Sequence, residues 1–120
     1  MTARAQTARA GAFSAQETRL LRQVKEAVRQ AEPQAQVILF GSRARGDAGE
    51  ESDWDLLVLV DAEVDPRRKD AIRQRLYALT LTLPDCPALS AIVHSRTEWD
   101  SPLFHAMPFH ERVDAEGVPL

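Results

Sequence analysis

The chain is short of the features that mark several protein classes. Its 120 residues include one cysteine, Cys86, so no disulfide can form within it. None of its apolar runs approaches the roughly 20 residues of a membrane span, and the N-terminus lacks the apolar segment of a secretory signal. Fifteen Lys and Arg stand against 18 Asp and Glu, a net charge of −3, so the chain lacks the positive charge that drives non-specific nucleic-acid binding. We therefore expect a cytoplasmic protein without membrane or strong nucleic-acid binding.

The N-terminal half opens with a tail and a helix. Residues 1–12 have no useful periodicity and are predicted to be a flexible tail, with a single domain over residues 13–120. Residues 14–17, SAQE, form a capping box that predicts the start of a helix, which ends near Pro33. Asp65-Pro66 predicts the start of a second long helix, because Asp suits the N-cap and Pro the first turn.

Short apolar runs predict the strands of one sheet. These runs lie at residues 36–40, 56–60 and 89–94. Because strands and helices alternate, we predict the α/β (α+β) class: a small mixed sheet, with the two long helices packed on one face and the active site on the other. Trp54 is expected to pack against the two long helices, and Trp99 to anchor the core under the C-terminal segment.

The segment with the strongest chemical pattern is residues 41–55, GSRARGDAGEESDWD, which lies between two apolar runs. In a strand, residues two apart point to the same face, so Asp53 and Asp55 project together and Trp54 projects to the other side. Two carboxylates this close repel each other unless a cation lies between them. Mg²⁺ or Mn²⁺ fits, because such ions bind through one or two carboxylates plus substrate phosphates.

The start of the same segment predicts a phosphate site. Gly41 permits a sharp turn and a close approach of the backbone. The hydroxyl of Ser42 and the amides that follow it are suited to hold a phosphate, especially where a helical turn begins. Arg43 and Arg45 add guanidinium groups that match phosphate oxygens. We therefore predict that Gly41, Ser42, Arg43 and Arg45 bind a nucleoside triphosphate.

Gly41-Ser42, followed after ten residues by Asp53-Trp54-Asp55, resembles the signature of the DNA polymerase beta-type nucleotidyltransferase superfamily. The longer string GSRARGDAGEESDWDLLV resembles its minimal nucleotidyltransferase branch. The resemblance implies a polymerase beta-like fold, ATP as the nucleotide, and Asp53 and Asp55 as catalytic metal ligands. It also implies a HEPN-domain toxin as partner, because many members are antitoxins of such toxins and some transfer AMP to a tyrosine of the toxin.

One position departs from the family pattern. The superfamily has a third aspartate on a later strand, and Ser90 stands at the corresponding place here. A hydroxyl is a poor substitute for a carboxylate that helps to hold the metal activating the acceptor. Asp85, five residues earlier, is an alternative ligand, although its neighbours Pro84 and Cys86-Pro87 predict a turn residue.

Three functions remain open on the sequence alone. The first is an active transferase that modifies a partner protein. The second is an antitoxin or binding module that neutralises its partner by contact, and the third is a transferase for a hydroxylated small molecule. Asp53, Asp55, Gly41 and Ser42 favour the first, Ser90 favours the second, and the short chain disfavours the third. Homo-oligomer formation is left open.

Two further groups of side chains have ordinary and specific interpretations. His105 and His110 are expected at the surface or a helix end rather than as a metal pair. A basic cluster on the second long helix is expected to be a solvated face, with a docking surface for an acidic partner as the alternative. The cluster consists of Arg67, Arg68, Lys69, Arg73 and Arg75.

Overall fold

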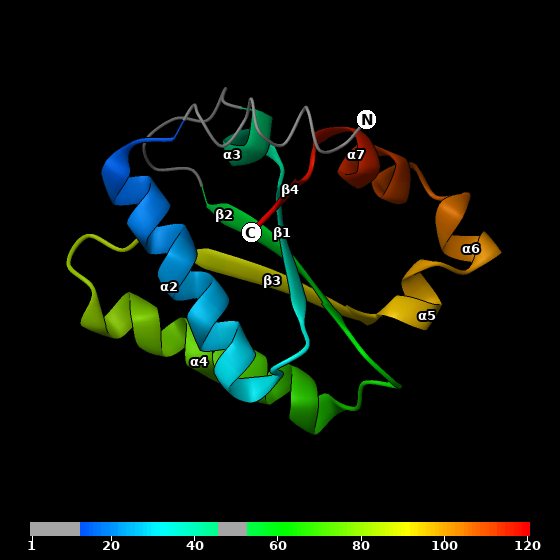
Figure 1. The fold of residues 1–120 in the computed structure, drawn as a ribbon, viewed down its shortest axis with the longest axis horizontal. Helices are drawn as coiled ribbons and strands as arrows, with labels where there is room; N and C mark the ends of the chain where they lie inside the picture. Colours follow the sequence, from blue (N-terminus) through cyan, green and yellow to red (C-terminus); the bar gives the residue numbers. More distant parts are fainter. Residues whose placement is uncertain (1–12, 46–52) are drawn as a thin grey trace.

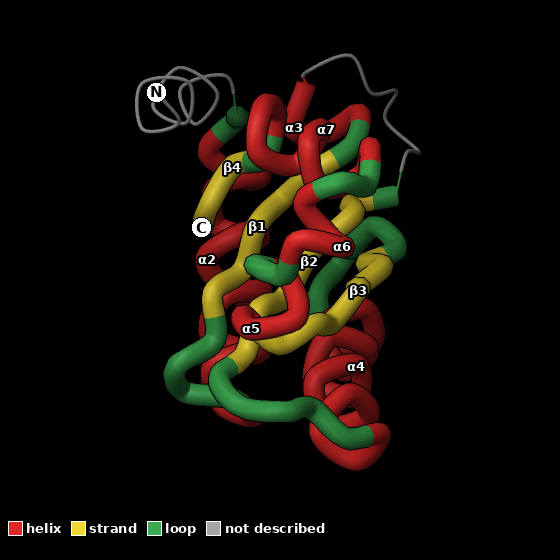
Figure 2. The backbone as a smooth tube through the Cα atoms, turned by 90° about the vertical axis from the view of Figure 1, so that its right-hand side faces the viewer, coloured by secondary structure: helices red, strands yellow, loops and turns green. Residues whose placement is uncertain are grey.

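A computed structural model describes residues 13–45 and 53–120 of the chain (Figure 1). The predicted tail over residues 1–12 and residues 46–52 of the motif loop lie outside these ranges, so the tail stays a prediction. A mixed sheet lies between a layer of two long helices and a layer of three short ones (Figure 2). The predicted mixed α/β class is therefore confirmed.

The sheet has four strands in the order β3-β2-β1-β4. They are β1 (Gln36–Phe40), β2 (Trp54–Val60), β3 (Leu89–Ser95) and β4 (Val118–Pro119). β2 runs antiparallel to β1 and parallel to β3, and β1 pairs antiparallel with β4. β2 is flanked on both sides and covered on both faces, which explains why its sequence is apolar at almost every position.

The two long helices, α2 (Ala15–Ala31) and α4 (Pro66–Thr82), cover one face of the sheet. Both begin as predicted. The Ser14 hydroxyl accepts from the Glu17 amide in a complete capping box, and the Asp65 carboxylate accepts from the Arg68 amide with Pro66 at the first turn. Their apolar faces pack on alternate residues of β2, including Trp54, which confirms its predicted place.

The opposite face is covered by short helices near the C-terminus. These are α5 (Arg96–Trp99), α6 (Pro102–His105) and α7 (Pro108–Glu116). Leu57 and Leu59 of β2 pack there against Trp99 and Val113, which confirms Trp99 as a core anchor. The sequence placed long helices on one face but did not predict that α5, α6 and α7 would cover the other.

His110 lies in the first turn of α7, which is one of the two places expected for it. It is not a surface side chain, because only 3 % of it is exposed. Its ring stacks on Trp99 with centroids 4.2 Å apart, and its Nδ1 lies 3.2 Å from an Asp114 carboxylate oxygen. Helix α7 turns this side chain inward because the preceding short helices place Trp99 beneath it.

Within the two described ranges, no helix combines the length and apolar character needed to span a membrane.

Candidate functional site

The candidate site begins where β1 ends in a glycine turn. Gly41 follows Phe40 with φ +81°, a left-handed conformation that favours glycine. A Cβ atom on Gly41 would lie 2.7 Å from Oδ2 of Asp55, so the turn presses its backbone against this carboxylate. The helical turn α3 (Ser42–Arg45) starts at the next residue. The structure thus brings the predicted phosphate turn and one predicted metal ligand into contact.

The two predicted metal ligands differ in environment. Asp53 is exposed just before β2, whereas Asp55 is half-buried within the strand. Burial, and then the nearby charge of Asp53, raise the pKa of the Asp55 carboxyl above its ordinary value of 3.8. A cation between the carboxylates would relieve this repulsion, so the donor set fits a hard divalent ion.

The site offers a cation fewer protein ligands than a closed cage would. Among the described residues, no group of three or more His, Cys, Asp or Glu side chains could hold a metal. Mg²⁺ in a two-carboxylate site completes its shell with water and substrate phosphates. The side chains therefore fit a metal that arrives with a nucleotide better than a permanently bound structural metal.

The register of the strands places Ser90 beside Asp55. Asp55 pairs with Phe40 on β1 and with Ser90 on the parallel strand β3. Paired residues point to the same face, so the Ser90 hydroxyl faces the same side as the carboxylate, as expected of the third acidic position. The exposed side chain of Ile92 follows on that face.

Asp85 does not join the carboxylates. It has φ +57° in the turn between α4 and β3, which confirms the predicted turn residue. Its side chain helps to line a pocket that also includes Trp54, on the face of β2 opposite to Asp55.

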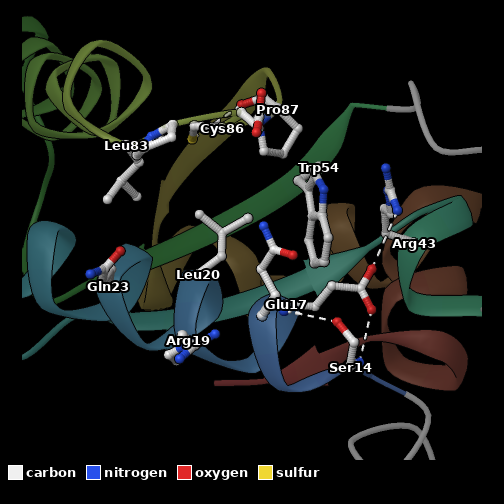
Figure 3. A pocket seen from close by; sticks show the side chains of 13 residues that line it. Ser14, Glu17, Arg19, Leu20, Gln23, Arg43, Trp54, Leu83, Cys86 and Pro87 are labelled. Carbon is white, nitrogen blue, oxygen red and sulfur yellow. Dashed lines mark hydrogen bonds and ion pairs between the residues drawn. The ribbon is translucent and has the colours of Figure 1, made fainter.

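Arg43 has contacts toward the long-helix face, and the binding of phosphate by its guanidinium stays a prediction. Its guanidinium carbon is 4.8 Å from the centre of the Trp54 ring, and its Nη1 is 3.5 Å from a Glu17 carboxylate oxygen (Figure 3). These contacts tie α3 to the start of α2. Arg45 lies in α3, but its side chain falls outside the described part of the structure.

The pocket drawn in Figure 3 has a volume of about 470 Å³. It lies between α2 and the turn that joins α4 to β3, and Arg43 and Glu17 are part of its lining. Its lining includes Glu17, Arg43 and Trp54 but not Gly41, Ser42 or either predicted metal ligand. We therefore place the candidate site at the Gly41 turn and the Asp55 face, not in this pocket.

An aromatic wall beside the carboxylates was not foreseen from the sequence. Phe40 is the cross-strand neighbour of Asp55, and its ring meets Phe109 of α7 edge-on with centroids 5.1 Å apart. The position of Phe40 directly before Gly41 was the available signal for the first ring. Phe109 carried no comparable signal, because its place depends on how α7 folds back over the sheet.

Comparison with known proteins identifies the family of this chain. A family profile described as nucleotidyltransferase domain matches residues 21–98, which is more than half of the chain. Among curated proteins, none matches significantly. Among solved structures, a chain from a toxin–antitoxin complex with AMP-PNP is similar, with a TM-score of 0.57 and 18% identity over 82% of this chain and 69% of that chain. At this identity the structural similarity shows the fold alone. The matched residues contain β1, the Gly41 turn, β2 and β3, and this chain therefore belongs to the nucleotidyltransferase domain family.

Proposed function

We propose that this chain is a Mg²⁺- or Mn²⁺-dependent nucleotidyltransferase that transfers AMP from ATP to a partner protein. The observation that carries the proposal is the contact between the Gly41 turn and the Asp55 carboxylate, with Asp53 two residues away. Such an arrangement holds the triphosphate next to the metal ligands. The proposed setting is cytoplasmic, with the chain as antitoxin of a HEPN-domain toxin. The similarity to a chain from a toxin–antitoxin structure with AMP-PNP supports a protein partner and a bound nucleotide.

Each residue has a proposed part. The backbone at Gly41 and the Ser42 hydroxyl with the first amides of α3 bind the triphosphate, and Asp53 and Asp55 hold the metal. Bound there, Mg²⁺ would neutralise phosphate charge and polarise the acceptor hydroxyl. Arg43 and Arg45 remain proposed phosphate ligands. Arg43 also contacts Trp54 and Glu17, and these contacts hold α3 against the start of α2.

The proposed reaction needs only ATP and the acceptor hydroxyl as reactants. The acceptor hydroxyl oxygen forms a bond to the α-phosphorus of ATP, while the bond from that phosphorus to the bridging oxygen breaks. Pyrophosphate leaves, and the hydroxyl proton passes to water. The aromatic wall of Phe40 and Phe109 limits water on one side of Asp55.

Calorimetry with Mn²⁺ and AMP-PNP tests the site. We expect metal-dependent binding by the wild type, lost in Asp53→Asn and Asp55→Asn, with Asp100→Asn as an exposed control on α5's C-terminal side. Intact mass of a co-expressed HEPN-domain partner, with ATP and Mg²⁺, should rise by one AMP. Equal binding by all four proteins would refute the site, while a bound nucleotide without a mass change would refute the transfer.

A second function is favoured by one observation. Ser90 lies next to Asp55 where the family has a third carboxylate. A chain that binds nucleotide but transfers slowly or not at all would act as a binding module that neutralises its partner by contact. The mass measurement separates the two, because in this case the complex forms and the mass of the partner stays unchanged.

A further inference from the structure

The outer edge of β3 is open. β3 is the first strand in the order β3-β2-β1-β4, and within the described ranges no strand pairs with its other side. The Trp54 amide donates to the Ala88 carbonyl over 3.0 Å, so the backbone of Ala88 faces β2. Because backbone direction alternates along a strand, Leu89, Ala91 and Val93 turn their N–H and C=O groups to the open side. An open edge of this kind is a template for an added strand.

A groove runs beside this edge, between β3 and α4. It has a volume of about 540 Å³ and an apolar body that includes Leu76, Tyr77, Leu89 and Ala91. Tyr77, which is 65% exposed, offers an aromatic surface along this groove. Ser90 also borders the groove, so the groove reaches the strand position that faces Asp55.

The charge of α4 indicates what the groove binds. The helix carries five basic residues and one acidic residue, although the chain as a whole has a net charge of −3. Arg73 lines the groove, and Lys69 lies one turn before it on the same side of the helix. Pairing of β3 with β3 of a second copy would bring these cations against their counterparts. The charge therefore favours an acidic partner over a second copy of this chain.

We propose that the acceptor protein docks by adding an extended acidic segment to the β3 edge as a fifth strand. Its side chains would alternate between the α4 groove and the face that bears Ser90 and Asp55. A strand added at the usual spacing of about 4.8 Å places the residue opposite Ser90 roughly two spacings from Asp55, with its side chain on the carboxylate face. This docking rests on the proposed transfer to a protein and names how the acceptor is presented.

Random twelve-residue peptides displayed on phage provide the probe. They are selected on the full chain without ATP or metal, and the enriched peptides are synthesised with a fluorescent label for anisotropy. We expect enrichment of acidic peptides with alternating apolar residues. Since no nucleotide is present, the measurement succeeds or fails independently of nucleotidyl transfer, which the mass measurement reports.

Two variants locate the binding. Ala91→Pro removes an outward N–H, and proline is tolerated at such edge positions, so the sheet should persist while the added strand is blocked. Arg73→Glu reverses a charge at the groove. Each should weaken peptide binding at least about tenfold. Arg22→Glu, on the exposed side of α2, is the matched charge control and should bind as the wild type does.

Several results would overturn the docking mode. One is a selection that yields no acidic peptide, and another is peptides that bind both variants as tightly as the wild type. A third is a wild-type dimer that Ala91→Pro converts to a monomer, which would assign the edge to a second copy. If Ala91→Pro does not fold, as judged by circular dichroism, Arg73→Glu and Tyr77→Ala decide the outcome.

Discussion

The two faces of the sheet are built in different ways. Between the sheet and the two 17-residue helices α2 and α4 lies one buried cluster of sixteen residues from the described ranges. Under α5, α6 and α7 the buried cluster has five residues, and the helices have four, four and nine. The carboxylates lie on the second face. Stability is concentrated on one side of β2 and the candidate chemistry on the other, where a smaller core leaves room for charged groups.

The largest expected effects are losses of stability at two neighbouring residues of β2, one on each face of the sheet. Leu56 and Leu57 are both fully buried, but they belong to different clusters. We expect each change to alanine to cost about 2–5 kcal/mol, with the larger loss for Leu56→Ala, because the helices over Leu57 are shorter and can relax into the cavity. Urea unfolding of both variants measures this. A larger loss of stability for Leu57→Ala would contradict the idea that the short helices relax more easily than the long ones.

The next comparison uses two glycines on the second face, one at the candidate site and one in the packing of α7. Gly41→Val should abolish AMP-PNP binding, because a side chain there meets Asp55 and the turn has a positive φ. Gly117→Ala is the matched control. Its Cβ would lie 2.6 Å from the Val113 carbonyl oxygen, so it should lower the Tm without changing nucleotide affinity. A folded Gly41→Val protein with unchanged affinity would show that the turn is not the phosphate site.

Ser90→Asp tests whether the second face lacks one ligand. An added carboxylate beside Asp55 should speed AMP transfer at least about tenfold, which is less than the roughly 10²–10⁴-fold that a well-placed acid–base group contributes. Ser90→Asn controls for size without charge. The measurement is single-turnover transfer to a HEPN-domain partner. A wild type that already transfers AMP rapidly, and is slowed by Ser90→Asp, would mean that transfer does not need a third carboxylate at this position.

On the first face, Arg68 joins the two long helices. Its Nη2 lies 2.7 Å from a Glu32 carboxylate oxygen, and this partnership lowers the pKa of Glu32 below its ordinary value of 4.5. Arg68→Ala should cost about 1.5–3 kcal/mol at pH 7. The part that comes from the Glu32 charge is present above pH 4.5 and is lost as the pH falls through the lowered pKa, so the Tm difference should shrink in acid. The bonds from Arg68 to the Glu63 and Asp61 carbonyls remain.

Arg75→Ala is the control for this pair, because Arg75 donates to the uncharged Gln30 side chain over 3.1 Å. Its Tm difference from the wild type should not depend on pH between 3 and 7. A constant difference for Arg68→Ala over the same range would show that the charge of Glu32 contributes nothing.

The smallest effect is expected at Asp55. Since its pKa is raised, the ionised carboxylate costs stability at pH values above 3.8, and Asp55→Asn should raise the Tm of the metal-free protein slightly at pH 7. The gain should vanish near pH 3, where both states of the wild type bind the proton. With Mn²⁺ and AMP-PNP the wild type should have the higher Tm. Asp70→Asn, at an exposed position of α4, is the control for the loss of one negative charge. A lower Tm of Asp55→Asn without metal would contradict the repulsion.

The sequence predicted the first face better than the second for a physical reason. Ser14, Asp65 and Pro66 act within one turn of the helices they begin, so their signals are local. The family resemblance placed Ser90 at the third acidic position, and the parallel register of β2 and β3 confirms that it lies beside Asp55. The inward turn of His110, the packing of Phe109 on Phe40 and the strand β4 depend on contacts between distant segments. The contacts of Arg43 with Trp54 and Glu17 were not predicted, because these two residues come together only in the fold.

Because side chains alternate along β2, Trp54 can serve as an intrinsic fluorescence probe of the carboxylates. Trp54 stands between Asp53 and Asp55 in the chain, with its ring on the opposite face under the Arg43 guanidinium. Any change in how the carboxylates are held alters the backbone that also carries the indole, and any movement of α3 alters the cation above it. The emission of Trp54 in a Trp99→Phe background should therefore change when the carboxylates bind metal and nucleotide, without any added label.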